Sequence, residues 1–331
     1  MWLQVRSLLR CALMLCAHTR YWPGPVEFDF DIALERNFRL FAVRRTATML
    51  DTRLSPPNGS PSLSRAIVYI LLDGELHWHA PQSLSLTAPG GFVAPLHDVV
   101  GGSGKRSRDY SSGGPLYQSL QLWVPALYLA RPVLEPTSVV LSASTLDAAR
   151  AYAAVVHRRG PIDVLERARI LAPLLAALQR DGVLNTDLAA TIEPDEGVVG
   201  SVWKYVAPWF ESMALSGSLD SLASRAGLSI RQMGRRLDHL GITFELPWIG
   251  WRALARGMRL RLAVLLLSNP DLSIAAIADG TGYSSAEALA HALRAEGLPS
   301  PSEVRRRSMN GPGARVGTDT SPRRPVVLQL G

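Results

Sequence analysis

The stretch Ser218–Leu237 reads SLDSLASRAGLSIRQMGRRL, and its pattern predicts two short helices joined by a turn. Apolar residues recur at helical spacing up to Ala226, and Gly227 follows where the first helix would end. Glycine favours that place because it enters the left-handed conformation without the steric penalty of a side chain. Ser229 and Gln232 then form an S-x-x-Q capping box, which begins a second helix. Helix, glycine-containing turn and helix together predict a helix-turn-helix.

The second of these helices is predicted to have an apolar side and a polar side. At 100° per residue, the inward side carries Ile230, Met233, Leu237 and Leu240. Arg236 falls toward this side, where it would affect stability or contact the DNA backbone. The outward side carries the predicted base-reading residues, which are Arg231, Gln232, Arg235 and His239. Arginine suits this role because its guanidinium can bond O6 and N7 of guanine at once. The alternative interpretation is the solvated face of an ordinary helical hairpin.

The same arrangement recurs downstream. Ser273 precedes Gly282 by the same interval that separates Ser218 from Gly227, and Ser284 is predicted to cap the following helix with Glu287 completing its capping box. The residues of this second unit expected to contact DNA are Ser284, Ser285, Glu287, His291 and Arg294. A long helix predicted over Trp251–Leu267 joins the two units. Two such units on one rigid body can enter successive major grooves about 34 Å apart.

These stretches resemble the AraC/XylS family of bacterial transcription regulators. The resemblance covers residues 216–307 and rests on the opening stretch, on RLRLAVLLLSNPDLSIAAIADGTGYSS (259–285) and on SPSEVRR (300–306). It implies a seven-helix DNA-binding domain, here 201–307, behind an N-terminal domain, often a cupin-like barrel, that senses a small molecule or mediates dimerisation.

The chain also departs from the family pattern. Residues 244–250 look like an insertion, and GLPSP at 297–301 replaces the usual Gly-x-Ser-Pro. Leucines stand where the recognition helices of the family usually carry aromatic residues, at Leu237, Leu289 and Leu293. These departures indicate a divergent member.

The N-terminal half has the alternation of short β-strands. Apolar and polar residues alternate from Phe38 to about Ser142, and Gly and Pro separate the segments. The run Ile67–Leu72 is expected to end in a turn at Asp73-Gly74, and residues 101–114 are expected to form a Gly/Ser-rich loop. After Ser144, the apolar residues recur at helical spacing. The predicted fold class is therefore α+β, with a cupin-like β-barrel at 26–145, a helical linker or dimerisation region at 146–200, and an all-α domain with two helix-turn-helix units.

Three histidines of the predicted barrel are candidate ligand contacts. His77 and His79 share one face of a strand, and His97 follows PGGFVAPL. Converging histidines are also typical of metal-binding cupins, so a cupin-like metalloenzyme with a helical appendage is the alternative function. The cupin metal motif needs a glutamate shortly after H-x-H, and Ala80–Ser83 supplies none. We therefore expect no metal, no cofactor, no catalytic residue and no enzymatic activity.

Charge and composition agree with an anionic partner for the C-terminal part. The chain has 35 Lys+Arg against 28 Asp+Glu, and residues 201–331 hold 16 basic and 10 acidic side chains. Only two of the basic residues of the whole chain are lysines, so a GC-rich genome is another source of the arginines. The two cysteines, Cys11 and Cys16, cannot form a disulfide framework or a four-cysteine zinc site. No apolar run approaches the roughly 18 residues of a membrane span.

The two ends of the chain carry weaker signals. Residues 1–25 are expected to be an N-terminal extension, helical or arising from an upstream start codon rather than a secretory leader, and 308–331 a disordered tail. A membrane or secreted helical protein is thus the least favoured alternative. The predicted function is a cytoplasmic, sequence-specific DNA-binding regulator that responds to a small-molecule effector. Its expected partner is double-stranded DNA, and the resemblance also admits RNA polymerase and a second copy of the chain.

Overall fold

The computed structural model describes residues 15–21, 26–35, 37–55, 65–80, 83–95, 109–158, 162, 164–191, 203–207, 218–243 and 250–310.

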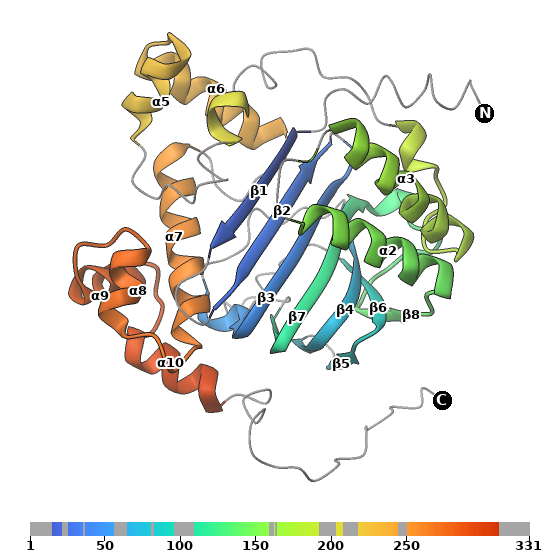
Figure 1. Cartoon of the computed structure of the whole chain (residues 1–331), viewed down its shortest axis with the longest axis horizontal. Coiled ribbons are helices and arrows are strands. Elements are labelled where there is room, and N and C mark those ends of the chain that lie inside the picture. The colour runs from blue at the N-terminus through green and yellow to red at the C-terminus, as the bar shows by residue number, and fades with distance from the viewer. Residues whose placement is uncertain are drawn as a thin grey trace.

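The N-terminal half is an antiparallel sheet of eight strands (Figure 1). The strands are β1 (Leu15–Tyr21), β2 (Phe28–Leu34), β3 (Arg39–Asp51), β4 (Arg65–Ala80), β5 (Leu84–Thr87), β6 (Gly90–Pro95), β7 (Asp109–Pro125) and β8 (Thr137–Val139). They lie in the order β1-β2-β3-β7-β4-β6-β8, and β5 pairs with β4. Short 3-10 turns follow β3 at Thr52–Leu54 and β7 at Ala126–Tyr128.

Three sequence expectations for this half are wrong. Leu15–Tyr21, assigned to the N-terminal extension, is a strand that pairs with β2 along its whole length. Asp73-Gly74 is not a turn, because β4 continues through it to Ala80 and the pairing with β7 shifts register on both sides of Asp73. Gly74 is at φ 88°, and a Cβ there would meet the carbonyl oxygen of Gly113 at 2.8 Å, so this glycine makes a bulge. The end of the expected 101–114 loop is also strand, since β7 begins at Asp109.

The sheet separates two apolar cores. On one face, alternate residues such as Val68 and Leu122 pack against helices α2 (Ala143–Val156) and α3 (Val164–Arg180). Both helices belong to the helical region predicted at 146–200, although α2 begins three residues earlier, at Ala143. On the other face, Tyr69 and Trp78 belong to a largely aromatic core with Phe92. Strand alternation produces this division, because successive side chains point to opposite faces.

The C-terminal half is helical. Its helices are α5 (Leu219–Ala226), α6 (Ile230–Thr243), α7 (Trp251–Leu267), α8 (Ile274–Gly280), α9 (Ala286–Ala295) and α10 (Pro301–Asn310). The bounds of α7 are those that the sequence predicts. Helix α10 runs to Asn310, so the expected disordered tail begins no earlier than residue 311, and 311–331 lie outside the described residues. Residues 203–207 are also helical.

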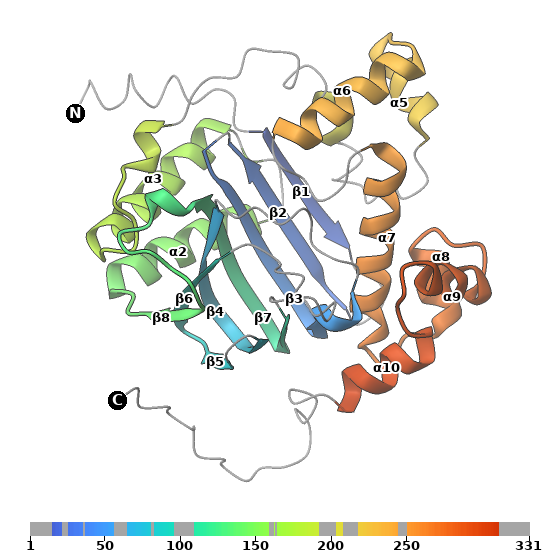
Figure 2. The same cartoon turned by 180° about the vertical axis from the view of Figure 1, so that it is seen from behind.

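Helix α7 runs alongside the sheet, with α5 and α6 near one end and α8–α10 near the other (Figures 1 and 2). Each end shares a core with the sheet. Ile32 and Leu34 of β2 pack with Leu222 and Leu237 of the first helix pair, and Phe28 of the same strand packs against the core of the second pair. The last turns of α7 pack between β3 and the helices α8 and α10, which explains why all of Leu262–Leu267 is buried. Among the helices described, none is both long and apolar enough to cross a membrane.

Candidate DNA interface and effector site

The first helix-turn-helix unit has the local geometry that its sequence predicts. Ser218 caps α5, since its Oγ accepts a hydrogen bond from the Ser221 N–H at 3.0 Å. Gly227 is left-handed at φ 62°, and the N–H of Leu228 reaches back to the carbonyl of Ala223, which closes the helix in a Schellman motif. The capping box before α6 also forms: Gln232 Oε1 accepts from the Ser229 N–H at 2.9 Å.

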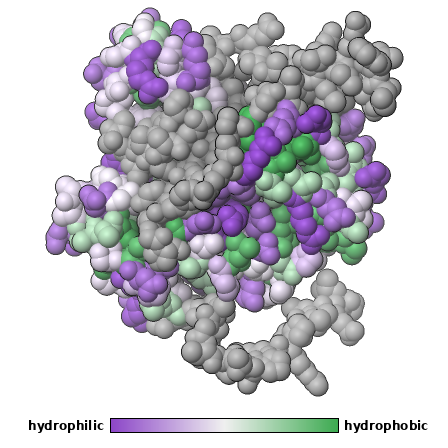
Figure 3. Space-filling model, in the orientation of Figure 1, coloured by the Kyte–Doolittle hydropathy of each residue, from purple (hydrophilic) through white to green (hydrophobic). Residues whose placement is uncertain are grey.

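Helix α6 has the polar side that the sequence predicts. Arg231, Gln232, Arg235 and His239 are all exposed, and Arg236 is half-buried. Met233, Leu237 and Leu240 are buried, as expected, but Ile230 is 51% exposed and does not belong to the inward side. The first residue of a helix has no preceding turn to pack against, so periodicity alone misplaced it. On the face seen in Figure 3, hydrophilic residues gather over α5 and α6. Their role in base reading stays a prediction.

The second unit repeats the turn geometry with one correction. Ser273 caps α8 through the Ala276 N–H at 3.0 Å, and Gly282, at φ 78°, precedes a Tyr283 N–H that bonds the Ala278 carbonyl at 2.8 Å. The cap of α9 is Ser285 rather than Ser284, because the Ala288 N–H bonds Ser285 Oγ at 3.2 Å.

The exposed face of α9 differs in charge from that of α6. The residues predicted to contact DNA are all exposed, namely Ser284, Ser285, Glu287, His291 and Arg294. A hydrogen bond with Ser285 is the main cause that lowers the pKa of Glu287, so this carboxylate stays ionised at neutral pH. The face therefore presents a negative charge in the first turn of α9 and one arginine in its last turn. Leu289 and Leu293 are fully buried beneath it.

Hydrogen bonds tie the start of the second unit to the sheet, through two residues that the sequence did not single out. Ser268 and Asn269 follow α7 directly and are buried. Ser268 Oγ accepts from the Met49 N–H at 2.8 Å, and Asn269 Nδ2 donates to the Ala47 carbonyl at 3.0 Å. Ala47 lies at φ 49°, where a side chain is strained, and it is skipped in the pairing of β3 with β7. We call Ser268, Asn269 and this bulge of β3 the latch.

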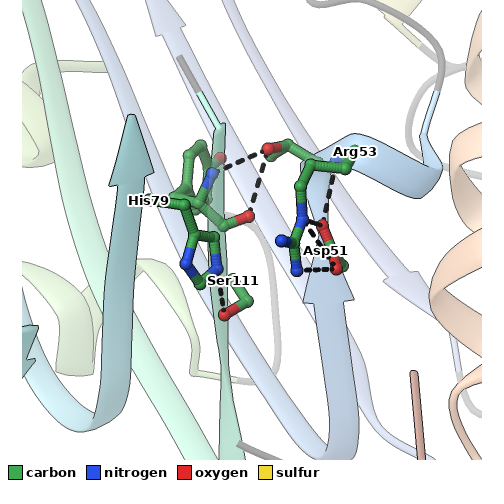
Figure 4. A network of polar contacts seen from close by, with 6 residues as sticks. Asp51, Arg53, His79 and Ser111 are labelled. Atoms are coloured by element: carbon green, nitrogen blue, oxygen red, sulfur yellow. Dashed lines mark hydrogen bonds and ion pairs between the residues drawn. The ribbon is translucent and has the colours of Figure 1, made fainter. Parts of the chain in front are cut away.

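Of the predicted histidines, His77 and His79 have different hydrogen-bond partners. His77 lies within hydrogen-bond distance of Ser85 Oγ (3.1 Å) and Glu75 Oε2 (3.3 Å). His79 bonds Ser111 Oγ at 2.9 Å, close to the Asp51–Arg53 ion pair (Figure 4). Partial burial is the main cause that lowers the pKa of His79, and the charge of Arg53 adds to it. His97 lies outside the described residues. In the part of the chain that the structure describes, no three His, Cys, Asp or Glu side chains form a group that could hold a metal ion.

The aromatic face of the sheet instead holds a row of polar groups. Arg45 is 2% exposed, and its guanidinium lies 4.1 Å from the ring centre of Tyr117. The Tyr117 hydroxyl bonds that of Tyr69, which also accepts from Gln121 Nε2 at 3.3 Å. Arg45 Nη2 donates to the carbonyl and hydroxyl of Ser112 at 2.9 and 2.6 Å. Burial lowers the pKa of Arg45 and raises that of Tyr69.

The position of Arg45 in this row of polar groups can be predicted from the sequence. Arg45 alternates with Phe41 and Val43, so a strand places it on their face. An arginine in the inward register of a strand is the sequence signal for this row. Ser268 and Asn269 carried no such signal, because their partners lie more than 200 residues away.

Comparisons with known proteins give remote likenesses. No protein-family model matches the chain, and no curated protein matches it. The structure is similar to that of ToxT from Vibrio cholerae, at 8% identity and TM-score 0.33, over 81% of this chain and 98% of that one. It is also similar to the AraC-like transcriptional activator CuxR, at 18% identity and TM-score 0.25, over 73% and 78% of the two chains. KdgF from Halomonas sp. matches 33% of this chain and 86% of its own, at 14% identity and TM-score 0.20. TM-scores of this size establish neither a shared fold nor a shared function.

Proposed function

We propose that this chain is a sequence-specific DNA-binding transcription regulator, a divergent relative of the AraC/XylS type. The observation that supports it most is the repeated unit: two helix-turn-helix pairs, each with a serine cap and a left-handed glycine, on the two ends of one long helix. Both second helices expose their polar sides. A solvated hairpin needs no such duplication, whereas a reader of two successive major grooves does.

In this proposal the first unit reads bases and the second mainly fixes position. Arg231 and Arg235 are exposed one turn apart on α6, where each can address a guanine. The sheet acts as the sensor, since both units share cores with it and the latch bonds it to the end of α7, shortly before α8. A ligand on the aromatic face would then act on DNA binding through contacts that already exist. The protein would act beside DNA in the cytoplasm, with homodimerisation and contact with RNA polymerase as further proposals.

A mobility-shift titration of the full-length chain tests the DNA-binding function. The probe is a duplex that the protein itself selects from a random pool, with a scrambled duplex as control. If six or more phosphates are neutralised, raising salt from about 50 to 200 mM should weaken binding by roughly 10³-fold or more. Equal affinity for the selected and scrambled duplexes would contradict sequence-specific recognition, and the absence of a salt slope would contradict duplex binding altogether.

A further inference from the structure

We infer that Ile230 of α6 contacts the C5-methyl group of a thymine in the major groove, and that Gly234 leaves the room for this contact. The inference rests on the proposed function, because it adds a base-reading residue to the helix that would enter the groove. It gives α6 a preference for thymine beside the preference for guanine assigned to its arginines.

Ile230 is an exposed apolar side chain at the start of α6. It is the first residue of the helix, and 51% of it is exposed. The capping box of Ser229 and Gln232 holds the backbone on both sides of it. When a recognition helix docks in the major groove, its N-terminal residues contact the base edges. Ile230 therefore lies in the turn of α6 that would face the bases.

Gly234 lies in the interior of α6, at a position that does not need a glycine. Its φ is not in the left-handed region, in contrast to that of Gly227 at 62°. A Cβ at Gly234 would meet nothing within 4 Å in the described part of the chain beyond the backbone of its own helix, whereas one at Gly113 would meet the Thr48 carbonyl oxygen at 2.5 Å. Glycine also makes a helix less stable than alanine does. The free space beside Gly234 is thus open to a molecule outside the chain.

Ile230 and Gly234 belong to the same side of α6. Residues four apart are neighbours on a helix surface, and side chains lean toward the N-terminal end of the helix. A side chain at position 234 would therefore lie over Ile230, and glycine leaves the isoleucine uncovered. Gly234 is also three residues from Arg231, so this uncovered strip lies next to the arginine side of the helix.

The chemistry of the strip matches thymine. Thymine presents a methyl group in the major groove, and apolar side chains recognise it by direct contact. Isoleucine has no polar side-chain atom with which to bond a base edge or a phosphate. Arg231 and Arg235 are exposed on the adjacent side, where their charge attracts the phosphates and their guanidinium groups can bond guanine. The thymine would then lie beside the base pairs that these arginines contact.

Replacing thymine by deoxyuridine tests the contact, because it removes only the C5-methyl group. Each thymine of the selected duplex is replaced in turn, and the full-length chain is titrated by mobility shift. At one position the replacement should weaken binding by about fourfold, the effect of exposing one methyl-sized group. Ile230→Ala should bind the thymine and deoxyuridine duplexes equally there. If no position shows the loss, or if Ile230→Ala retains it, the inference is wrong.

Ile242→Ala is the matched control for Ile230→Ala. Ile242 is the same residue type near the other end of α6, and it is 64% exposed. Its replacement should leave the affinity and the preference for thymine over deoxyuridine as in the wild type. A loss of this preference in both variants would indicate a general weakening of α6 and would overturn the contact.

Gly234→Ala separates room for DNA from stability of the helix. Alanine should raise the midpoint of thermal unfolding by about 2 °C, because it is the better helix former. It should also weaken binding to the selected duplex by about fivefold or more, the effect of losing one base contact, because its methyl group fills the space beside Ile230. A stabilised variant with unchanged affinity and unchanged thymine preference would contradict the inference.

Failure of this inference can be distinguished from failure of the proposed function. The wild-type chain is titrated with the selected and scrambled duplexes in the same series. A salt-dependent, sequence-specific shift without any deoxyuridine effect would overturn the thymine contact and leave the regulator proposal standing. Equal binding to the two duplexes would overturn both.

Discussion

The first and second helix-turn-helix units close their leading helices in the same way but differ in what they present and in how they are held. Helix α6 exposes Arg231 and Arg235, whereas α9 exposes Arg294 with Glu287 near the start of the same helix. The first unit is attached to β2 through an apolar core, and the second is attached through an apolar core and the latch. Local backbone geometry is thus shared while charge and attachment diverge. The difference suggests a division of labour, in which the first unit selects bases and the second takes the signal from the sheet.

The largest loss of stability should come from substitutions in the apolar cores, which the two units have in common. Leu237 of α6 and Leu289 of α9 are both buried, so replacing either with alanine should lower the free energy of unfolding by about 2–5 kcal/mol. Ile242→Ala is the control, because that side chain is 64% exposed and its loss should change stability by less than about 0.5 kcal/mol. Denaturant titration followed by circular dichroism measures all three. A negligible effect of Leu289→Ala would show that the second unit is not packed as a unit.

The next effect concerns base selection, where the units should differ. Arg231→Ala and Arg235→Ala should each weaken binding to the selected duplex by about 1–3 kcal/mol, or roughly 5- to 150-fold, with a smaller loss on scrambled DNA. Arg236→Ala is the control, because Arg236 is half-buried on α6 and should affect stability or backbone contact instead. Should Arg236→Ala alone relax specificity, the assignment of the outward face is wrong.

Much of this comparison could be predicted from the sequence, because it depends on local signals. Ser218, Gly227 and Ser273 act through partners within five residues, and the periodicity of 251–267 fixes the bounds of α7. Local sequence rules fail where two adjacent residues could equally cap a helix, as with Ser284 and Ser285. They also fail at the first residue of a helix, such as Ile230, which has no preceding turn to pack against.

The errors in the N-terminal half have a different cause. Leu15–Tyr21 becomes a strand because β2 offers it an edge, and that pairing is not visible in its own sequence. Asp73-Gly74 has the composition of a hairpin turn, but the long partner β7 spans both sides of it and makes it a bulge. The latch joins residues more than 200 positions apart. Arg45 is the exception, since its inward register could be read from the alternation.

A third prediction tests the difference in attachment. Asn269→Ala removes the buried hydrogen bond to the Ala47 carbonyl and should cost about 1–2 kcal/mol of stability. Hydrogen exchange should become faster in α8 and α9 and stay unchanged in α5 and α6, because the bond holds the second unit. Asn185→Ala is the matched control: its side chain also donates to backbone carbonyls, those of Leu127 and Leu129, but within the N-terminal half. Faster exchange in α8 and α9 in both variants would indicate general loosening instead of a latch.

The smallest expected effect is on DNA affinity, and it tests whether α9 contacts phosphates or reads bases. Arg294 is exposed near the end of the helix, and if it contacts phosphate its replacement by alanine should weaken all duplexes alike and reduce the salt slope by about one. Glu287→Gln gives a change of opposite sign, because Glu287 is ionised and exposed on the same helix, where it repels phosphate. Removing that charge should strengthen binding to selected and scrambled DNA by similar, less than tenfold, factors. Mobility-shift titrations at several salt concentrations measure both variants. If either substitution changes the preference for the selected duplex while the salt slope stays constant, α9 reads bases and the division of labour between the two units is lost.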